Sequence, residues 1–258
     1  MSLIQFIGRK IISFFEELGK IVLLLGKVIK YLPTVFHTRG NVISQMTQIG
    51  VKSLPLVLMI GLFTGAISAL QATNLFAKFN LVSLARTFIG GSIATVVFTE
   101  LSPVLTALVI AGRIGGSIAA QIGTMVVSEQ VDALEMMAIP PARYLAMPRV
   151  FATAIMLPVL IVFSNIIAIV GSYILMVVKF GFSAEDFFGS LQRYFAINEL
   201  LTGLFKAFIF GCATSVLSCH VGFSTTGGAE GVGASTVRAF TLSSSSILLL
   251  DALLGYLL

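Results

Sequence analysis

Charged residues are scarce in this sequence. Only 10% of its 258 residues are Asp, Glu, Lys or Arg, whereas an average soluble domain has about 25%. Hydrophobic residues make up 57% of the chain, and the mean hydropathy is +1.03. This composition excludes an ordinary soluble domain and indicates an integral membrane protein. Because a bilayer offers no water to backbone N–H and C=O groups, we expect the long apolar runs to be α-helices.

Tryptophan is absent, and there are only two cysteines and two histidines. Without tryptophan, any aromatic anchoring at the membrane surface depends on the 21 phenylalanines and five tyrosines. If Cys212 and Cys219 share one helix, they lie about 10 Å apart along its axis, which is too far for a disulfide. We therefore expect two free thiols and no metal site.

The first 52 residues differ from the rest because polar residues recur there at close to the helical period. Glu16 and Lys20 stand four positions apart, where opposite charges on a helix attract. The best apolar run of this region, Ile21–Leu25, is too short for the core of a signal peptide. Residues 1–52 are thus predicted to form an amphipathic segment in the membrane interface. Residues 53–258 are predicted to form a five-span membrane domain.

The membrane domain has five apolar stretches, at about residues 53–75, 88–123, 151–178, 200–218 and 239–257. Ser53 is suited to cap the first. The second exceeds the roughly 20 residues that cross a bilayer, which predicts a tilt, a kink at Pro103 or an extension beyond the membrane. The fold class is therefore all-α: an integral membrane helical bundle with an N-terminal amphipathic interfacial helix and five transmembrane helices. Five positions are expected to shape close helix packing: Gly61, Gly65, Pro103, Gly112 and Gly116.

The distribution of Lys and Arg predicts the orientation of the chain. If the N-terminus lies inside, the inner segments carry eleven basic residues and the outer loops carry four. The positive-inside rule then places the N-terminus in the cytoplasm and the C-terminus at the outer face.

The polar segment Val127–Arg149 stands between two long apolar stretches. Glu129, Asp132 and Glu135 recur every third residue, which predicts a short helix over residues 127–139 with a polar stripe. Pro140-Pro141 is expected to end it, because proline cannot donate a backbone hydrogen bond. Such a helix is either a solvated loop or a docking element for a protein in the aqueous phase.

Three ionisable residues fall within the predicted spans: Glu100, Lys206 and Asp251. A charge at the bilayer centre costs about 2.5–3.5 kcal/mol on the insertion scale, so such residues normally face a bundle interior or a wet cavity. All three lie in the middle or the outer half of their spans. They either line one polar cavity or form an ion pair that only locks the helices together.

The glycine-rich stretch Thr225–Gly233 is not a phosphate-binding loop, because it lacks the Lys of a P-loop and follows no strand. A tight turn is the expected structure. The sequence also shows no pairing of a nucleophile with a base, so we expect a non-catalytic chain without a nucleotide site.

Several strings together resemble the MlaE permease family: Glu100-Leu-Ser-Pro103, Ala111–Ser117, Glu129–Met137, Gly227–Gly233 and Asp251 in the last span. The resemblance covers roughly residues 40–258. It implies the membrane subunit of an ABC transporter that moves phospholipids between the bacterial inner membrane and an MCE protein.

The family resemblance also implies partners. These are a second permease copy in a homodimer, a cytoplasmic ABC ATPase dimer that binds ATP and Mg, a hexameric MCE protein, and a STAS-domain protein. No nucleic acid and no cofactor in this chain are expected. The family's coupling helix matches the polar segment, at Glu129, Gln130, Asp132, Leu134, Glu135, Met136 and Met137. Its intramembrane charges match Glu100, Lys206 and Asp251.

Two alternatives come from other classes of protein. The three intramembrane charges could serve an ion- or proton-coupled secondary transporter, although five spans without a visible inverted repeat argue against it. A purely structural scaffold would need these charges to be dispensable.

Overall fold

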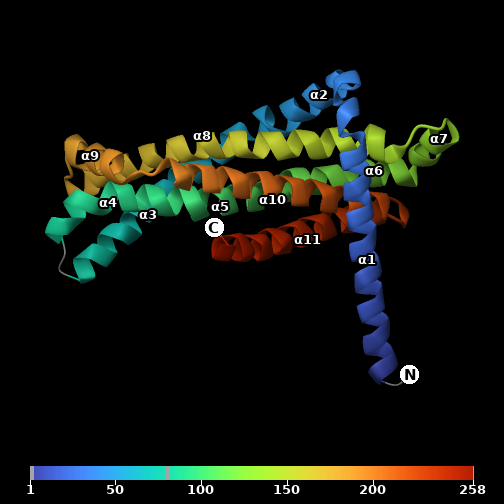
Figure 1. The fold of residues 1–258 in the computed structure, drawn as a ribbon, viewed down its shortest axis with the longest axis horizontal. Coiled ribbons are helices and arrows are strands. Elements are labelled where there is room, and N and C mark those ends of the chain that lie inside the picture. Colours follow the sequence, from blue (N-terminus) through green and yellow to red (C-terminus); the bar gives the residue numbers. More distant parts are fainter. Residues whose placement is uncertain (1–2, 80–81, 258) are drawn as a thin grey trace. The chain divides into compact units, whose positions relative to one another are not determined.

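The computed structural model describes residues 3–79 and 82–257, and every regular element in that part of the chain is a helix (Figure 1). Helix α1 (Leu3–Tyr31) and a 3-10 turn (Leu32–His37) precede the membrane domain. The other helices are α2 (Arg39–Ile49), α3 (Leu54–Lys78), α4 (Val82–Val96), α5 (Ser102–Ile110), α6 (Gly116–Val127), α7 (Gln130–Met136), α8 (Met147–Phe180), α9 (Ala184–Tyr194), α10 (Ile197–Phe223) and α11 (Gly228–Leu257). The predicted all-α class and N-terminal helix are confirmed.

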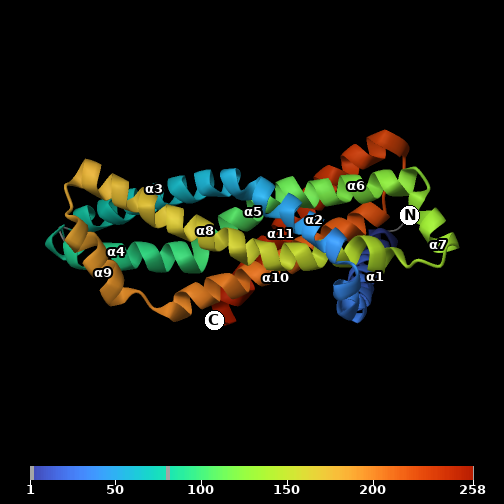
Figure 2. The same ribbon diagram turned by 90° about the horizontal axis from the view of Figure 1, so that it is seen from above.

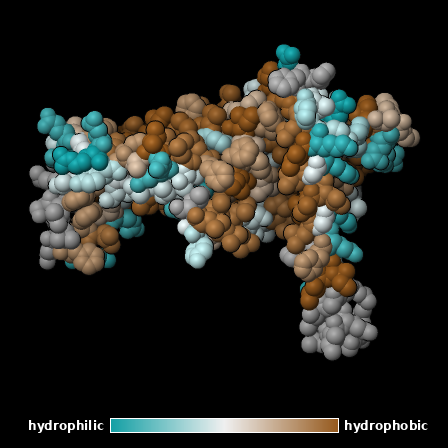
Figure 3. Space-filling view, viewed as in Figure 1, coloured by the Kyte–Doolittle hydropathy of each residue, from teal (hydrophilic) through white to brown (hydrophobic). Residues whose placement is uncertain are grey.

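Five helical stretches are long and apolar enough to cross a membrane, as the sequence predicted: Arg39–Lys78, Thr87–Val127, Ala142–Phe180, Ile197–Phe223 and Gly228–Leu257. Large apolar side chains remain exposed along them, and Met59, Phe63 and Ile67 form one such stripe on α3. Figure 3 shows the same pattern, with hydrophobic side chains over much of the surface and polar ones gathered over α9. An apolar exterior of this kind suits contact with lipid tails.

The chain forms two compact units. Helices α8, α10 and α11 are each divided between the two, with one part in each unit. Unit 1 comprises Met1–Gln45, Ala111–Thr153 and Cys212–Ser245. Unit 2 comprises Met46–Ile110, Ala154–Gly211 and Ser246–Leu258. The two are described separately below.

The long second span changes its helical geometry twice. A π-helical turn covers Val97–Leu101 and another covers Ala111–Gly115. In the first, the N–H of Ser102 donates to the carbonyl of Val97, five residues back, immediately before Pro103. Since proline has no N–H, a carbonyl one turn earlier loses its usual partner, and a π-turn redistributes these bonds. The predicted disturbance at Pro103 is thus a widened turn just before the proline.

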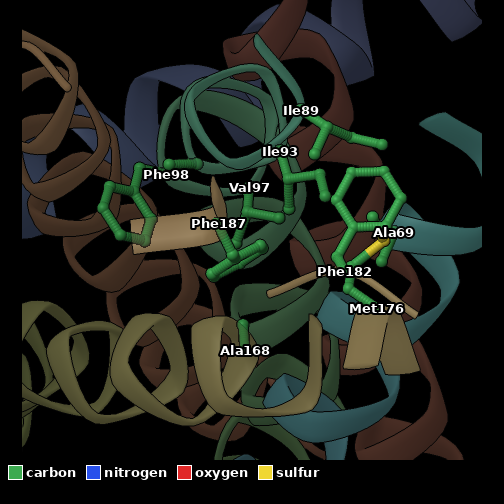
Figure 4. Packing of buried hydrophobic residues seen from close by; sticks show 10 residues of the cluster. Ala69, Ile89, Ile93, Val97, Phe98, Ala168, Met176, Phe182 and Phe187 are labelled. Atoms are coloured by element: carbon green, nitrogen blue, oxygen red, sulfur yellow. The ribbon is translucent and has the colours of Figure 1, made fainter. Parts of the chain in front are cut away.

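The core of unit 2 lies where α4 and α9 pack together, as Figure 4 shows for its buried side chains. Helix α9 lies between the predicted third and fourth spans, in a polar stretch for which no helix was predicted. Its inward face carries Phe187 and Ser190, both buried. Phe187 packs into the core, and the Ser190 hydroxyl accepts a hydrogen bond of 2.9 Å from the N–H of Gly90. The buried positions Phe187 and Ser190 are three residues apart, as on one face of a helix, so the segment forms an amphipathic helix here.

The structure also corrects the cap of α3. Ser53 forms no capping bond, because it has helical backbone angles in a 3-10 turn (Val51–Ser53) that runs directly into α3. Its hydroxyl is buried without a hydrogen-bond partner among the described residues. Ser183 instead caps α9 and accepts from the N–H of Asp186 at 3.0 Å.

This contrast predicts opposite results for two matched substitutions in unit 2. Ser183→Ala should lower the free energy of unfolding by about 1 kcal/mol, because a helix N–H loses its acceptor. Ser53→Ala should have no effect or stabilise the protein, since an unpaired buried hydroxyl is replaced by a methyl group. Thermal unfolding of both purified variants in the same detergent measures the difference. Equal losses for the two would contradict this account of the capping.

Unit 1 contains a shorter turn than the sequence suggested. The glycine-rich stretch was predicted to be a tight turn, and the turn occupies only its start, because α11 begins at Gly228. Within Thr225–Gly233, the residues with positive φ are Gly227 and Gly228, at 88° and 67°. A Cβ added to Gly231 would overlap the carbonyl of Thr226, so the chain turns tightly here.

Candidate functional site

The three intramembrane charges meet in unit 2. The Lys206 Nζ on α10 donates to Glu100 Oε1 at 2.7 Å and to Asp251 Oδ1 on α11 at 3.0 Å. The Lys206 side chain is 1% exposed, whereas Glu100 is 45% and Asp251 22% exposed. Sequence reasoning selected these residues from three different spans, and the fold joins them in a single cluster, the charged triad.

Local sequence explains how the helices approach at the charged triad. Gly203 stands one turn before Lys206 on α10, and a Cβ there would overlap the carbonyl of Phe98. Glu100 itself lies in the π-turn, where the wider backbone alters the direction of side chains. Gly255 follows Asp251 by one turn, and a Cβ on it would lie 3.7 Å from Glu100 Oε1. Gly203 thus allows α10 to approach the turn that carries Glu100, whereas a Cβ on Gly255 would be at an ordinary contact distance from the ion pairs.

The net charge of the charged triad is negative. Two carboxylates surround one ammonium group, so the cluster is net anionic when all three groups are ionised. Lys206 is fully buried and bonded to both acids, which makes its charge inaccessible. Glu100 is the most exposed member, so the charge that a molecule outside the triad meets is negative.

Glu199 is a polar residue that stands just before the predicted fourth span. It lies in the first turn of α10 and accepts a hydrogen bond of 3.0 Å from the hydroxyl of Thr95. Its second oxygen is buried without a partner among the described residues. No feature of the sequence distinguishes Glu199 from charged residues in loops, because a Glu at the start of a helix is usually exposed to solvent.

The predicted coupling helix is shorter than expected. Helix α7 covers Gln130–Met136, not residues 127–139, because Glu129 and Ala138 have left-handed backbone angles, with φ of 59° and 57°. The helix therefore ends before Pro140-Pro141 is reached. Its strongest surface feature is apolar: Met136 is 83% and Met137 62% exposed.

The other coupling positions divide between two environments. Glu129, Gln130, Asp132 and Glu135 are exposed, while Leu134 is partly buried. Val131 is buried and holds the helix to unit 1. Helices α1 and α7 also face one cleft of about 850 Å³, lined among others by Lys20, Lys27, Lys30, Asp132 and Glu135. Helix α7 is thus fixed on one side and open on the other.

The predicted packing positions lie at close helix contacts. Gly61 and Gly65 on α3 face the carbonyls of Ser164 and Ala168 on α8, which runs beside α3 in Figure 2. Pro103 is buried. In unit 1, a Cβ on Gly112 would lie 3.3 Å from the Phe240 ring, and one on Gly116 3.0 Å from Thr236.

The two cysteines are not members of the charged triad. Cys212 and Cys219 are free thiols on α10. Among the described residues, no group of three or more His, Cys, Asp or Glu side chains could hold a metal ion.

Fold and site together define a multi-pass α-helical membrane protein with a charged cluster between its spans. Its sequence matches the family described as Permease MlaE over residues 42–257, and the chain belongs to this family. It is 36% identical over 266 residues to a probable ABC transporter permease protein of Rickettsia typhi, covering 100% of this chain and 98% of that relative. The chain is accordingly an ABC transporter permease.

Two further relatives have more specific names. The intermembrane phospholipid transport system permease protein MlaE of Haemophilus influenzae is 32% identical over 255 residues, covering 98% of this chain and 96% of that protein. The chloroplastic protein TRIGALACTOSYLDIACYLGLYCEROL 1 of Arabidopsis thaliana is 36% identical over 228 residues, covering 88% of this chain and 64% of that protein.

Proposed function

We propose that this chain is the membrane subunit of an ABC transporter that moves glycerophospholipids between the bacterial inner membrane and an MCE-protein channel. The observation that carries the proposal is the charged triad, held between helices of a permease whose relative acts in phospholipid transport. Apolar spans suit the acyl chains of a lipid, and a charged cluster suits its headgroup.

The geometry of the charged triad favours one part of the headgroup. Because Lys206 is buried and both its bonds lie within the cluster, it does not offer a cation to a phosphate group. The exposed carboxylate of Glu100 would instead attract a positively charged headgroup such as that of phosphatidylethanolamine. In this proposal Lys206 holds the two acids in place.

Energy would come from a separate ATPase dimer that binds ATP and Mg. Met136, the last residue of α7, and Met137, which follows it, offer that partner an exposed apolar contact, with the acidic residues of α7 beside it. Methionine suits such contacts, since its flexible thioether adapts to the partner's surface. Closure of the ATPases would push on α7 and move the spans.

Membership of the family supports the proposed assembly. It comprises two copies of this chain, the ATPase dimer on the cytoplasmic side, a hexameric MCE protein on the outer side, and a STAS-domain protein. In this proposal the N-terminus and α7 lie in the cytoplasm and the C-terminus in the periplasm, an orientation that the distribution of basic residues supports.

Co-purification from native membranes in a mild detergent tests the assembly. We expect mass spectrometry to find two copies of this chain, an ATPase, an MCE protein and bound phospholipid. Recovery of the chain alone, with lipid no different from the bulk membrane, would contradict the proposal.

The charged triad also keeps one alternative open, a proton-coupled transporter that uses Glu100, Lys206 and Asp251 as a relay. Lipid transfer in proteoliposomes separates the two functions. Transport that requires ATP supports the ABC assignment, and transport that follows an imposed proton gradient without ATP supports the alternative.

Contact with the ATPase predicts a strong effect at Met136. Met136→Asp should reduce recovery of the ATPase with this chain by about tenfold or more, because a charge replaces an apolar contact at a small interface. Tyr256→Asp is the matched control: Tyr256 is also a large exposed side chain, at 91%, but stands near the end of α11. Equal recovery from Met136→Asp and the wild type would rule out α7 as the principal contact.

A further inference from the structure

A buried arginine in unit 1 is not explained by the proposed transport cycle. Arg149 lies in the first turn of α8 and is only 6% exposed. Its Nη1 donates to the carbonyl of Leu145 at 2.8 Å, and its Nη2 donates to Gln121 Oε1 on α6 at 3.2 Å. Its Nε is buried with no hydrogen-bond partner among the described residues.

The guanidinium also has no ionic partner in the part of the chain that the structure describes. Both groups that accept its hydrogen bonds are neutral, and the ion pairs formed by the described residues involve other side chains. A buried charge without a counter-charge is costly, and arginine cannot become neutral to avoid that cost. The charge of Arg149 is therefore left to be balanced by an anion that this part of the chain does not supply.

A pocket of about 170 Å³ lies beside Arg149. Polar side chains of α2 form one wall of the pocket, namely Asn41, Ser44 and Gln45. The other lining residues are Met125 on α6, Tyr144 and Leu145 just before α8, and Pro148 at its start. Amide, hydroxyl and guanidinium groups are the donors that bind phosphate oxygens in proteins. The pocket is large enough for one phosphate group and too small for an acyl chain.

We propose that this pocket, the Arg149 pocket, binds the phosphate group of an anionic glycerophospholipid from the adjacent leaflet. Two features favour a lipid over a free ion. The pocket adjoins the N-terminal amphipathic region, at α2. Arg149 also stands eight residues into a 39-residue span, of which roughly 20 residues suffice for the hydrocarbon core. This position places Arg149 toward the headgroup level.

The site is separate from the proposed transport site in its residues. No member of the charged triad lines it, and its charge is positive where the triad's is negative. A lipid held there would bridge α2, α6 and the start of α8 within unit 1. It would stabilise this unit whether or not lipid is transported at the triad.

Lipid binding to the full-length protein tests the proposal. The purified chain is stripped of lipid in a neutral detergent, and dioleoylphosphatidylglycerol is titrated in while native mass spectrometry counts bound lipid and thermal unfolding is followed. We expect the wild type to bind and to gain stability. Arg149→Gln should weaken this binding about tenfold or more, because hydrogen bonds to a charged group are lost.

Two further variants keep the test informative. Arg143→Gln removes a charge from the same segment without touching the pocket lining, and should bind as the wild type does. Ser44→Phe fills the pocket from α2 and leaves both Arg149 hydrogen bonds intact, so it should lose binding even if Arg149→Gln fails to fold. Wild-type binding by Ser44→Phe would overturn the site.

A parallel titration with inorganic phosphate distinguishes the source of the anion. We expect phosphate alone, at the same concentrations, to leave the unfolding temperature unchanged. A full stabilising effect of phosphate in the absence of lipid would overturn the lipid assignment. Failure of transport in an otherwise lipid-binding protein would count against the proposed function and not against this pocket.

Discussion

Replacing Lys206 with methionine should abolish lipid transport and lower the amount of folded protein. Methionine has a similar unbranched side chain but no charge, so it leaves the carboxylates of Glu100 and Asp251 without their shared ammonium group. Removing one partner of a buried ion pair costs about 3–5 kcal/mol, because the remaining charge stays buried and unpaired. Since Glu100 is nearly half exposed, water offsets part of this cost, and we expect a value of about 3 kcal/mol. Thermal unfolding in detergent and phospholipid transfer in reconstituted complexes measure the two effects.

A triple variant separates folding from transport. Lys206→Met combined with Glu100→Gln and Asp251→Asn removes every charge of the charged triad at nearly constant volume. Replacing all members of a buried ionic cluster is often neutral for stability, so this variant should fold at normal levels. Transport should remain absent, because no charge is left to meet a headgroup. If the triple variant transports lipid at the wild-type rate, the triad only locks the helices together.

The charged triad was the part of the site that the sequence predicted best. A charge within a long apolar stretch is conspicuous, and its cost in a bilayer demands a partner, so the amino-acid sequence alone suffices to group Glu100, Lys206 and Asp251. Which atoms pair could not be predicted. That depends on the π-turn at Val97–Leu101 and on the close approach at Gly203, which arise from packing between helices distant in sequence.

The features that the sequence did not predict correctly were missed for the same physical reason. Helix α9, the shortened α7 and the buried Arg149 all lie in polar stretches, where composition suggests solvent-exposed loops. Phe187 shows what decides such cases: a single large apolar residue becomes fully buried once α4 is beside it. Arg149 is the opposite case, since its burial follows from the packing of α2, α6 and α8, and no local pattern encodes that.

Gly65→Ala should destabilise the protein although it adds only one methyl group. The new Cβ would overlap the backbone carbonyl of Ala168 on α8, and a backbone cannot move aside as a flexible side chain can. Helices α3 and α8 are also joined here by the Ser172 hydroxyl, which donates to the carbonyl of Gly65 at 2.9 Å. Overpacking of a tight contact typically costs about 1–3 kcal/mol. Separating the helices would stretch this hydrogen bond as well, so we expect the upper end of that range, measured by thermal unfolding of the purified protein.

Gly189→Ala is the control, because it makes the same chemical change inside a helix where a Cβ meets no atom within 4 Å. Alanine is favoured over glycine in an exposed helix by about 1 kcal/mol, so this variant should be slightly more stable than the wild type. The two substitutions are thus expected to have opposite signs, although helix propensity alone predicts a gain for both. A gain in stability from Gly65→Ala would mean that α3 and α8 do not approach as closely as their backbones indicate. A loss confined to Gly65 would show that packing between spans, and not local helix preference, requires glycine at this position.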